Sequence, residues 1–172
     1  MKKYWLFVLT IWFMAYDKTA FAEWGEQYVM GKAGIMAVNI NNANPLVSLG
    51  VLYGFGLTAN VSTELELNAS LTGGEYAGEN DKGKFNIWTV AAYGVHRLAL
   101  SQEFYLKTKV GVLYGSFDRD SQLIRQNSAD GFGAAGGFGI GMIAGSVLTI
   151  ELEATFIDRD VYFYSLGAHY RF

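Results

Sequence analysis

The chain contains no cysteine, a single proline, Pro45, and two histidines. Without cysteine it can have neither a disulfide framework nor a thiolate metal site. Its formal net charge is −3, which argues against a nucleic-acid partner, because such partners need a basic surface. Beyond residue 22 no apolar run reaches about twenty residues, so helical membrane spans are excluded as well.

The N-terminus has the composition of a secretory signal peptide. Lys2 and Lys3 precede an apolar run over residues 4–16, and Ala20 and Ala22 supply an Ala-x-Ala cleavage site. The run is short for a spanning helix; the alternative is a retained membrane anchor. We therefore expect residues 1–22 to be a signal peptide and residues 23–172 to form one domain.

Apolar, aromatic and glycine residues are abundant instead: 51% of the residues are hydrophobic, 16% are aromatic and 21 are glycine. Along many segments, apolar residues alternate with small or polar ones. A period of two is typical of β-strands, because successive side chains leave opposite faces. The C-terminal segment 161–172 has the apolar row Tyr162, Tyr164, Leu166, Ala168, Tyr170 and Phe172, and the small or polar row Ser165, Gly167, His169 and Arg171.

Segments with this alternation recur along the whole chain, separated by residues typical of turns and loops. Longer connections, at 39–45, 72–84 and 118–130, follow the first, third and fifth of these segments. The connection after the seventh segment is the exception, because it is short. For the segment 85–98 the pattern does not decide whether Ile87, Ala91, Tyr93 and Val95 or Trp88, Val90, Ala92 and His96 face outward. We expect strands at about 28–38, 47–57, 61–71, 85–98, 104–116, 131–143, 147–157 and 161–172.

A chain this apolar without helical spans must pair its backbone polar groups in a closed barrel if it lies in lipid. The competing fold is a soluble β-sandwich, whose outward residues would be polar, whereas here one face of nearly every strand is apolar. The sequence therefore predicts an all-β protein, an eight-stranded antiparallel up-and-down transmembrane β-barrel. An even number of strands places both termini on one side.

An eight-stranded barrel is only wide enough for its own side chains to fill the interior. The inward rows hold four cations and four carboxylates, and buried charges are tolerated only when they are paired. We expect an interior polar network made of Lys32, Glu64, Glu66, Lys107, Lys109, Glu151, Glu153, His169 and Arg171.

Three motifs, at residues 31–34 (GKAG), 105–111 (YLKTKVG) and 166–172 (LGAHYRF), resemble the small eight-stranded barrels of the OmpA/OmpX-like group, also called porin-family or outer membrane protein β-barrel domains. The resemblance implies a monomer in the bacterial outer membrane, with both termini periplasmic and a plug of Lys, Arg and Glu in the lumen. Its partners would be outer-membrane lipids, lipopolysaccharide and the barrel-assembly machinery. The assembly signal would be Leu166, Ala168, Tyr170 and Phe172.

Three functions are compatible with such a barrel. The first is a non-enzymatic membrane protein whose extracellular loops serve envelope integrity or surface contacts, and the second is a narrow porin-like channel for small solutes or ions. The third is a lipid A-modifying enzyme, which needs a histidine, a hydroxyl and an acid within hydrogen-bond reach. Only His96 and His169 are available, and alternation places His169 in the lumen as part of the polar network.

Acidic residues in the loops, Glu75, Glu79 and Asp81, and the Asp-Arg-Asp runs at 118–120 and 158–160 could bind a divalent cation that bridges lipopolysaccharide. Such runs are more often simply solvated. We predict no catalytic residue, no metal site and no cofactor, and we favour the first function.

Overall fold

The computed structural model describes residues 25–39, 44–77, 82–121, 127–158 and 161–172. The predicted signal peptide lies outside these residues, as do Glu79 and Asp81. No helix in the described ranges is long and apolar enough to cross a membrane. The strands are β1 (Gln27–Val38), β2 (Leu46–Gly56), β3 (Val61–Ser70), β4 (Gly74–Ala77), β5 (Lys82–Ala99), β6 (Phe104–Ser121), β7 (Asn127–Ile143), β8 (Leu148–Asp158) and β9 (Val161–Arg171).

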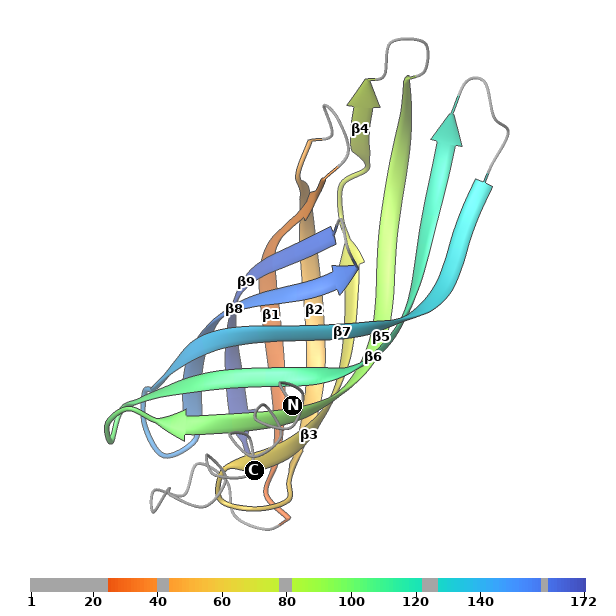
Figure 1. The fold of residues 1–172 in the computed structure, drawn as a ribbon. Coiled ribbons are helices and arrows are strands. Elements are labelled where there is room, and N and C mark those ends of the chain that lie inside the picture. The colour runs from red at the N-terminus through yellow and green to blue at the C-terminus, as the bar shows by residue number, and fades with distance from the viewer. Residues whose placement is uncertain (1–24, 40–43, 78–81, 122–126, 159–160) are drawn as a thin grey trace, which may run out of the picture.

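The strands form one antiparallel sheet that closes on itself (Figure 1). Its order is β3-β2-β1-β9-β8-β7-β6-β5-β4, and a further pairing between β3 and β5 completes the cylinder. The short strand β4 pairs only with the beginning of β5 and lengthens one side of the wall. Eight strands therefore surround the lumen, which confirms the predicted all-β, eight-stranded antiparallel barrel.

One side of the barrel is much taller than the other, and this corrects two predicted loops. Strands β5, β6 and β7 contain 18, 18 and 17 residues. The other strands that surround the lumen, β1, β2, β3, β8 and β9, contain ten to twelve. The predicted loops 72–84 and 118–130 are thus partly strand, in β4 and in the paired ends of β5, β6 and β7. The composition of these segments, rich in glycine and charged residues, is typical of a loop. The sheet nevertheless continues into them, because the backbone pairing of β5, β6 and β7 keeps one register.

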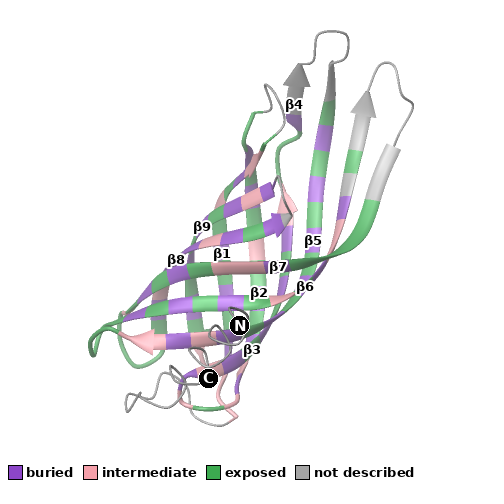
Figure 2. Ribbon diagram, in the orientation of Figure 1, coloured by how far each residue is buried: buried purple, intermediate pink, exposed green. Residues whose placement is uncertain are grey.

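Buried and exposed residues alternate along the strands of the wall (Figure 2), and many of the exposed residues are large and apolar. Leu65, Val110 and Leu152 are 60%, 71% and 58% exposed on the outward rows; the neighbours of Leu65 and Leu152 along their strands are buried, and Val110 lies between buried Lys109 and half-buried Gly111. The sequence left the facing of the segment 85–98 open. In the structure, Trp88 and Val90 of this segment face outward, and the row containing Tyr93 faces the lumen.

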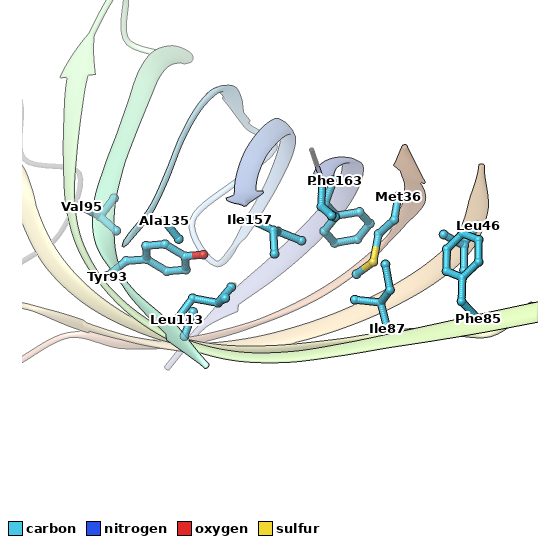
Figure 3. Packing of buried hydrophobic residues seen from close by; sticks show 12 residues of the cluster. Met36, Leu46, Phe85, Ile87, Tyr93, Val95, Leu113, Ala135, Ile157 and Phe163 are labelled. Carbon is cyan, nitrogen blue, oxygen red and sulfur yellow. The ribbon is translucent and has the colours of Figure 1, made fainter. Parts of the chain in front are cut away.

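Apolar side chains fill the half of the lumen that lies away from the C-terminus (Figure 3). Met36, Leu46, Phe85, Ile87 and Phe163 are each at most 4% exposed and belong to one cluster with residues of β6, β7 and β8. The charged residues therefore occupy the other half, nearer to the short turns and to Phe172.

Close approach of two strands requires a glycine at Gly34 in β1. A Cβ atom there would overlap the backbone carbonyl of Tyr164 in β9, whereas a Cβ on Gly31, which faces outward from the same strand, would meet nothing within 4 Å. A side chain at Gly34 can be accommodated only if the backbones separate.

We predict that Gly34→Ala lowers the free energy of unfolding by about 1–3 kcal/mol and that Gly31→Ala changes it by less than about 0.5 kcal/mol. Urea unfolding in lipid vesicles, followed by tryptophan fluorescence, measures both. Equal effects of the two substitutions would contradict this account of the β1–β9 contact.

Candidate functional site

Eight charged side chains meet inside the barrel. All of them occupy inward-facing positions, and none of the eight residues is more than 5% exposed. Three strands contribute pairs two residues apart, which project to the same face at successive heights. The residues are Lys32 from β1, Glu64 and Glu66 from β3, Arg97 from β5, Lys107 and Lys109 from β6, and Glu151 and Glu153 from β8.

The first layer of this ionic network is a ring of alternating charges. The Lys32 ammonium lies 2.7 Å from Oε1 of Glu66 and 3.0 Å from Oε1 of Glu153. The Lys109 ammonium lies 2.7 Å from Oε2 of Glu66 and 2.7 Å from Oε1 of Glu153. Each of the four groups therefore contacts two groups of opposite charge.

The second layer lies nearer to the short turns and has the same alternation. The Arg97 guanidinium is 2.8 Å from Glu64 and 3.7 Å from Glu151. The Lys107 ammonium is 3.0 Å from Glu64 and 2.9 Å from Glu151. A further contact of 2.9 Å between Lys107 and Glu153 joins the layers into one network.

Neutral side chains provide additional hydrogen bonds to the carboxylates. The Tyr28 hydroxyl donates to Glu64 at 2.8 Å, Asn68 donates to Glu66 at 2.8 Å and Thr155 donates to Glu153 at 2.9 Å, while the Tyr105 hydroxyl donates to Glu151. Such bonds matter because the attraction between buried ions offsets their lost hydration only when the remaining polar atoms also have partners.

Aromatic rings cover the cations on the remaining sides. The Lys109 ammonium lies 4.3 Å from the centre of the Tyr93 ring, and the Arg97 guanidinium lies 5.0 Å from that of Tyr28. Cations are attracted to the negative face of an aromatic ring. The network is thus enclosed by groups that suit its charges.

Glycines provide the space for these large side chains. A Cβ atom on Gly141 would overlap the ring of Tyr105, and one on Gly54 would overlap the ring of Tyr28. A Cβ on Gly137 would lie 3.1 Å from Cε of Lys109. Gly137 and Gly141 of β7 therefore have a packing role in the lumen, whereas a Cβ atom on Gly131 or Gly133 of the same strand would meet nothing within 4 Å.

Of the nine residues predicted for the network, the structure joins the three lysines and four glutamates by ion pairs, places His169 beside them, and puts Arg171 outside the network. Arg171 shares the inward row of β9 but lies near the end of the strand, 3.6 Å from Glu26, with 18% of its side chain exposed. The fourth cation is Arg97 instead. Sequence analysis missed Arg97 because the facing of residues 85–98 was undecided; its place in the row of Tyr93 and Val95 was the available signal.

The two histidines lie on opposite sides of the barrel wall. His169 is 4% exposed inside the lumen, next to the second layer, and its ring meets that of Tyr28 edge-on with centroids 5.2 Å apart. His96 lies on the outward row of β5, between Val61 and Thr108 of the neighbouring strands. They cannot act in one site. In the described part of the chain, no three His, Asp or Glu residues are grouped as metal ligands.

Solved structures share this fold at low sequence identity. Neisserial surface protein A aligns with a TM-score of 0.65 and 10% identity over 85% of this chain and 97% of its own. OprG from Pseudomonas aeruginosa aligns with a TM-score of 0.65 and 13% identity, over 90% of this chain and 99% of its own. Ail of Yersinia pestis aligns with a TM-score of 0.61 and 18% identity, over 87% of this chain and 100% of its own. No family model and no curated protein sequence matches the chain. At the level of the fold, the comparison confirms the likeness to small outer-membrane barrels.

We predict that Arg97→Leu lowers the free energy of unfolding by about 3–5 kcal/mol, because it leaves buried carboxylates short of a cation. Arg171→Leu, at the partly exposed end of the barrel, should cost less than about 1 kcal/mol. Urea unfolding of both variants in vesicles checks the assignment of the fourth cation. If Arg171→Leu proves the more damaging, that assignment is wrong.

Proposed function

We propose that this protein is a non-enzymatic integral protein of the bacterial outer membrane, whose lumen is plugged and whose tall side contacts the cell surface environment. The apolar outward rows support membrane insertion, since a closed barrel leaves no backbone edge in lipid. The structural relatives support the choice of membrane: OprG of Pseudomonas aeruginosa and Ail of Yersinia pestis, which share this fold, are outer membrane proteins.

Aromatic residues support a membrane boundary on the tall side. On the outer surface, the rings of Trp88, Tyr114 and Phe132 form a row across β5, β6 and β7, with centroid separations of 5.7 and 5.0 Å. Two residues further along, β6 and β7 carry Ser116 and Asp130, which form a hydrogen bond of 2.7 Å. Aromatic girdles next to polar residues are typical of the membrane interface.

The observation that carries the proposal is the ionic network itself. A solute or ion passing along the lumen would have to separate two layers of ion pairs and then cross the apolar cluster of Met36, Phe85 and Phe163. Both steps cost free energy, because each exposes unpaired charge or brings charge into an apolar space. This favours a plugged lumen over a narrow channel.

The tall side supplies the proposed contact surface. Beyond the aromatic row, β5, β6 and β7 with β4 form an extension above the short strands (Figure 1). We place this extension outside the cell and both termini in the periplasm, because Phe172 and the short turns share the other end. The protein would act as a monomer in contact with membrane lipids and lipopolysaccharide, either in envelope integrity or in surface contacts.

In planar lipid bilayers, we expect the purified full-length protein to give no stable open channel. A porin that conducts ions, inserted in the same bilayer, controls for membrane quality. A variant that lacks the second-layer cations, Arg97→Leu/Lys107→Met, should show brief openings if it still folds. Stable channels of substantial conductance in the unchanged protein would refute the plugged lumen.

We predict that Phe172→Ser reduces the amount of assembled barrel in the outer membrane several-fold, because the terminal aromatic resembles the signal that the assembly machinery reads. Phe172 is 64% exposed, and its amide donates a 3.0 Å hydrogen bond to Gln27 of β1. Phe104→Ser, at an outward position of the same end, is the matched control and should assemble normally. Heat-modifiable migration of outer-membrane fractions measures both, and equal levels would exclude Phe172 as the signal.

A further inference from the structure

The extension on the tall side leaves one edge of the sheet without a partner strand. Strand β7 pairs with β6 from Asn127 to Met142, whereas its pairing with β8 begins only at Gly136. Within the described part of the chain, residues 127–135 therefore have a strand on the β6 side alone. Figure 1 shows this part of β7 at the free side of the extension. The free edge is longer than the four-residue strand β4, which forms the opposite edge.

Every second residue of this edge directs its backbone polar groups away from β6. At the other end of β7, the amide of Ile143 donates a 2.8 Å hydrogen bond to the carbonyl of Glu103, which precedes β6. Because hydrogen-bonded pairs alternate along an antiparallel ladder, the odd-numbered residues of β7 bond to β6 and the even-numbered ones point the other way. In the free edge, the even-numbered residues are Ser128, Asp130, Phe132 and Ala134.

The free edge lacks the features that usually keep an edge from pairing. Proteins protect such edges with lysine, proline, bulges or very short strands. Residues 127–135 contain neither lysine nor proline, their only charged residue is Asp130, and they pair with β6 in one unbroken register. A row of free N–H and C=O groups is complementary to one further extended strand. The edge is therefore suited to strand addition.

The two faces of the edge favour different side chains in an added strand. On the outward face, Asp130 is exposed and Phe132 is 87% exposed. A basic side chain there would pair with the carboxylate and lie against the ring, since cations are attracted to aromatic faces. On the inward face, a Cβ atom on Gly131 or Gly133 would meet nothing within 4 Å. Bulky apolar side chains of a neighbouring strand can cover these glycines.

A second copy in the same membrane fits this edge poorly. Two barrels inserted side by side would be related by a two-fold axis along the membrane normal. Such an axis sets each polar group of one β7 at the height of its own counterpart, so N–H would meet N–H. An antiparallel strand from a different polypeptide pairs donors with acceptors instead.

We propose that the β7 edge at residues 127–135 binds an extended segment of another protein as an added antiparallel strand. In this segment, basic residues on the outward face alternate with bulky apolar residues on the inward face. The inference rests on the proposed function, because it names the kind of partner that the tall side contacts. Phe132 belongs to the aromatic row at the proposed membrane boundary, so residues 127–131 lie beyond it, within reach of a partner in water.

A capped, fluorescent peptide of alternating lysine and valine, as long as the edge, is the probe. Fluorescence anisotropy measures its binding to the full chain in phosphatidylcholine nanodiscs, with empty nanodiscs as the blank. Methylation of the lysine amide nitrogens removes the donors that face β7 and should weaken binding at least about tenfold. Methylation of the valine amide nitrogens is the matched control and should leave binding unchanged. No saturable binding, or equal binding of both methylated peptides, would overturn the proposal.

The variant Asp130→Lys replaces an attraction with a repulsion at the edge and should weaken binding of the unmethylated peptide roughly tenfold. Asp118→Lys is the matched control, because it changes the net charge equally at an exposed position of β6, one strand away from the edge. Its effect should stay below about threefold. Equal weakening by both substitutions would mean a general charge effect and contradict the role of Asp130; heat-modifiable migration verifies that both variants fold.

Hydrogen exchange locates the added strand. The bound peptide should slow exchange of the even-numbered amides, such as those of Asp130 and Phe132, at least about tenfold, and leave those of Gly131 and Gly133 nearly unchanged. Protection of the even-numbered amides without peptide, in nanodiscs that hold two copies, would make a second copy the occupant and overturn the proposal. A peptide that binds in nanodiscs but not to intact cells with the protein in their outer membrane would support the edge and contradict the proposed placement of the tall side.

Discussion

Eight charges share the inside of a barrel too narrow to hydrate them, and the rest of the structure depends on how they are arranged. Removing an ion from water costs several kcal/mol even after relaxation, and one opposite charge rarely offsets that cost. Here each carboxylate contacts at least two cations, and each cation at least two carboxylates; Lys107 and Glu153 contact three each. The charges are stable in the lumen only as a set.

This arrangement follows from the simplest property of a strand. Residues two apart project to the same face about 7 Å apart along the strand, so Glu64 with Glu66, Lys107 with Lys109 and Glu151 with Glu153 define two layers by spacing alone. Lys32 completes one layer and Arg97 the other. The same alternation gives the outer surface its apolar rows. The wall therefore separates a polar interior from an apolar exterior, and the residues of either face would be unstable on the other side.

The sequence predicted what depends on period and charge balance. The barrel, its strand number and most of the network could be read from alternation, since buried cations and carboxylates must balance. Two features could not be read. The segment 85–98 is apolar on both faces, so its facing, and with it the role of Arg97, required the neighbouring strands. The extension of β5, β6 and β7 has a loop-like composition, and only the backbone register reveals it.

Double-mutant analysis of Glu66 and Lys109, which lie 2.7 Å apart, tests the mutual neutralisation most directly. Glu66→Gln and Lys109→Met each leave an excess buried charge, whereas the double variant keeps three cations and three carboxylates. Unfolding free energies should show that each single change costs several kcal/mol and that the double variant costs clearly less than their sum. Additive costs would mean that the buried charges do not stabilise one another.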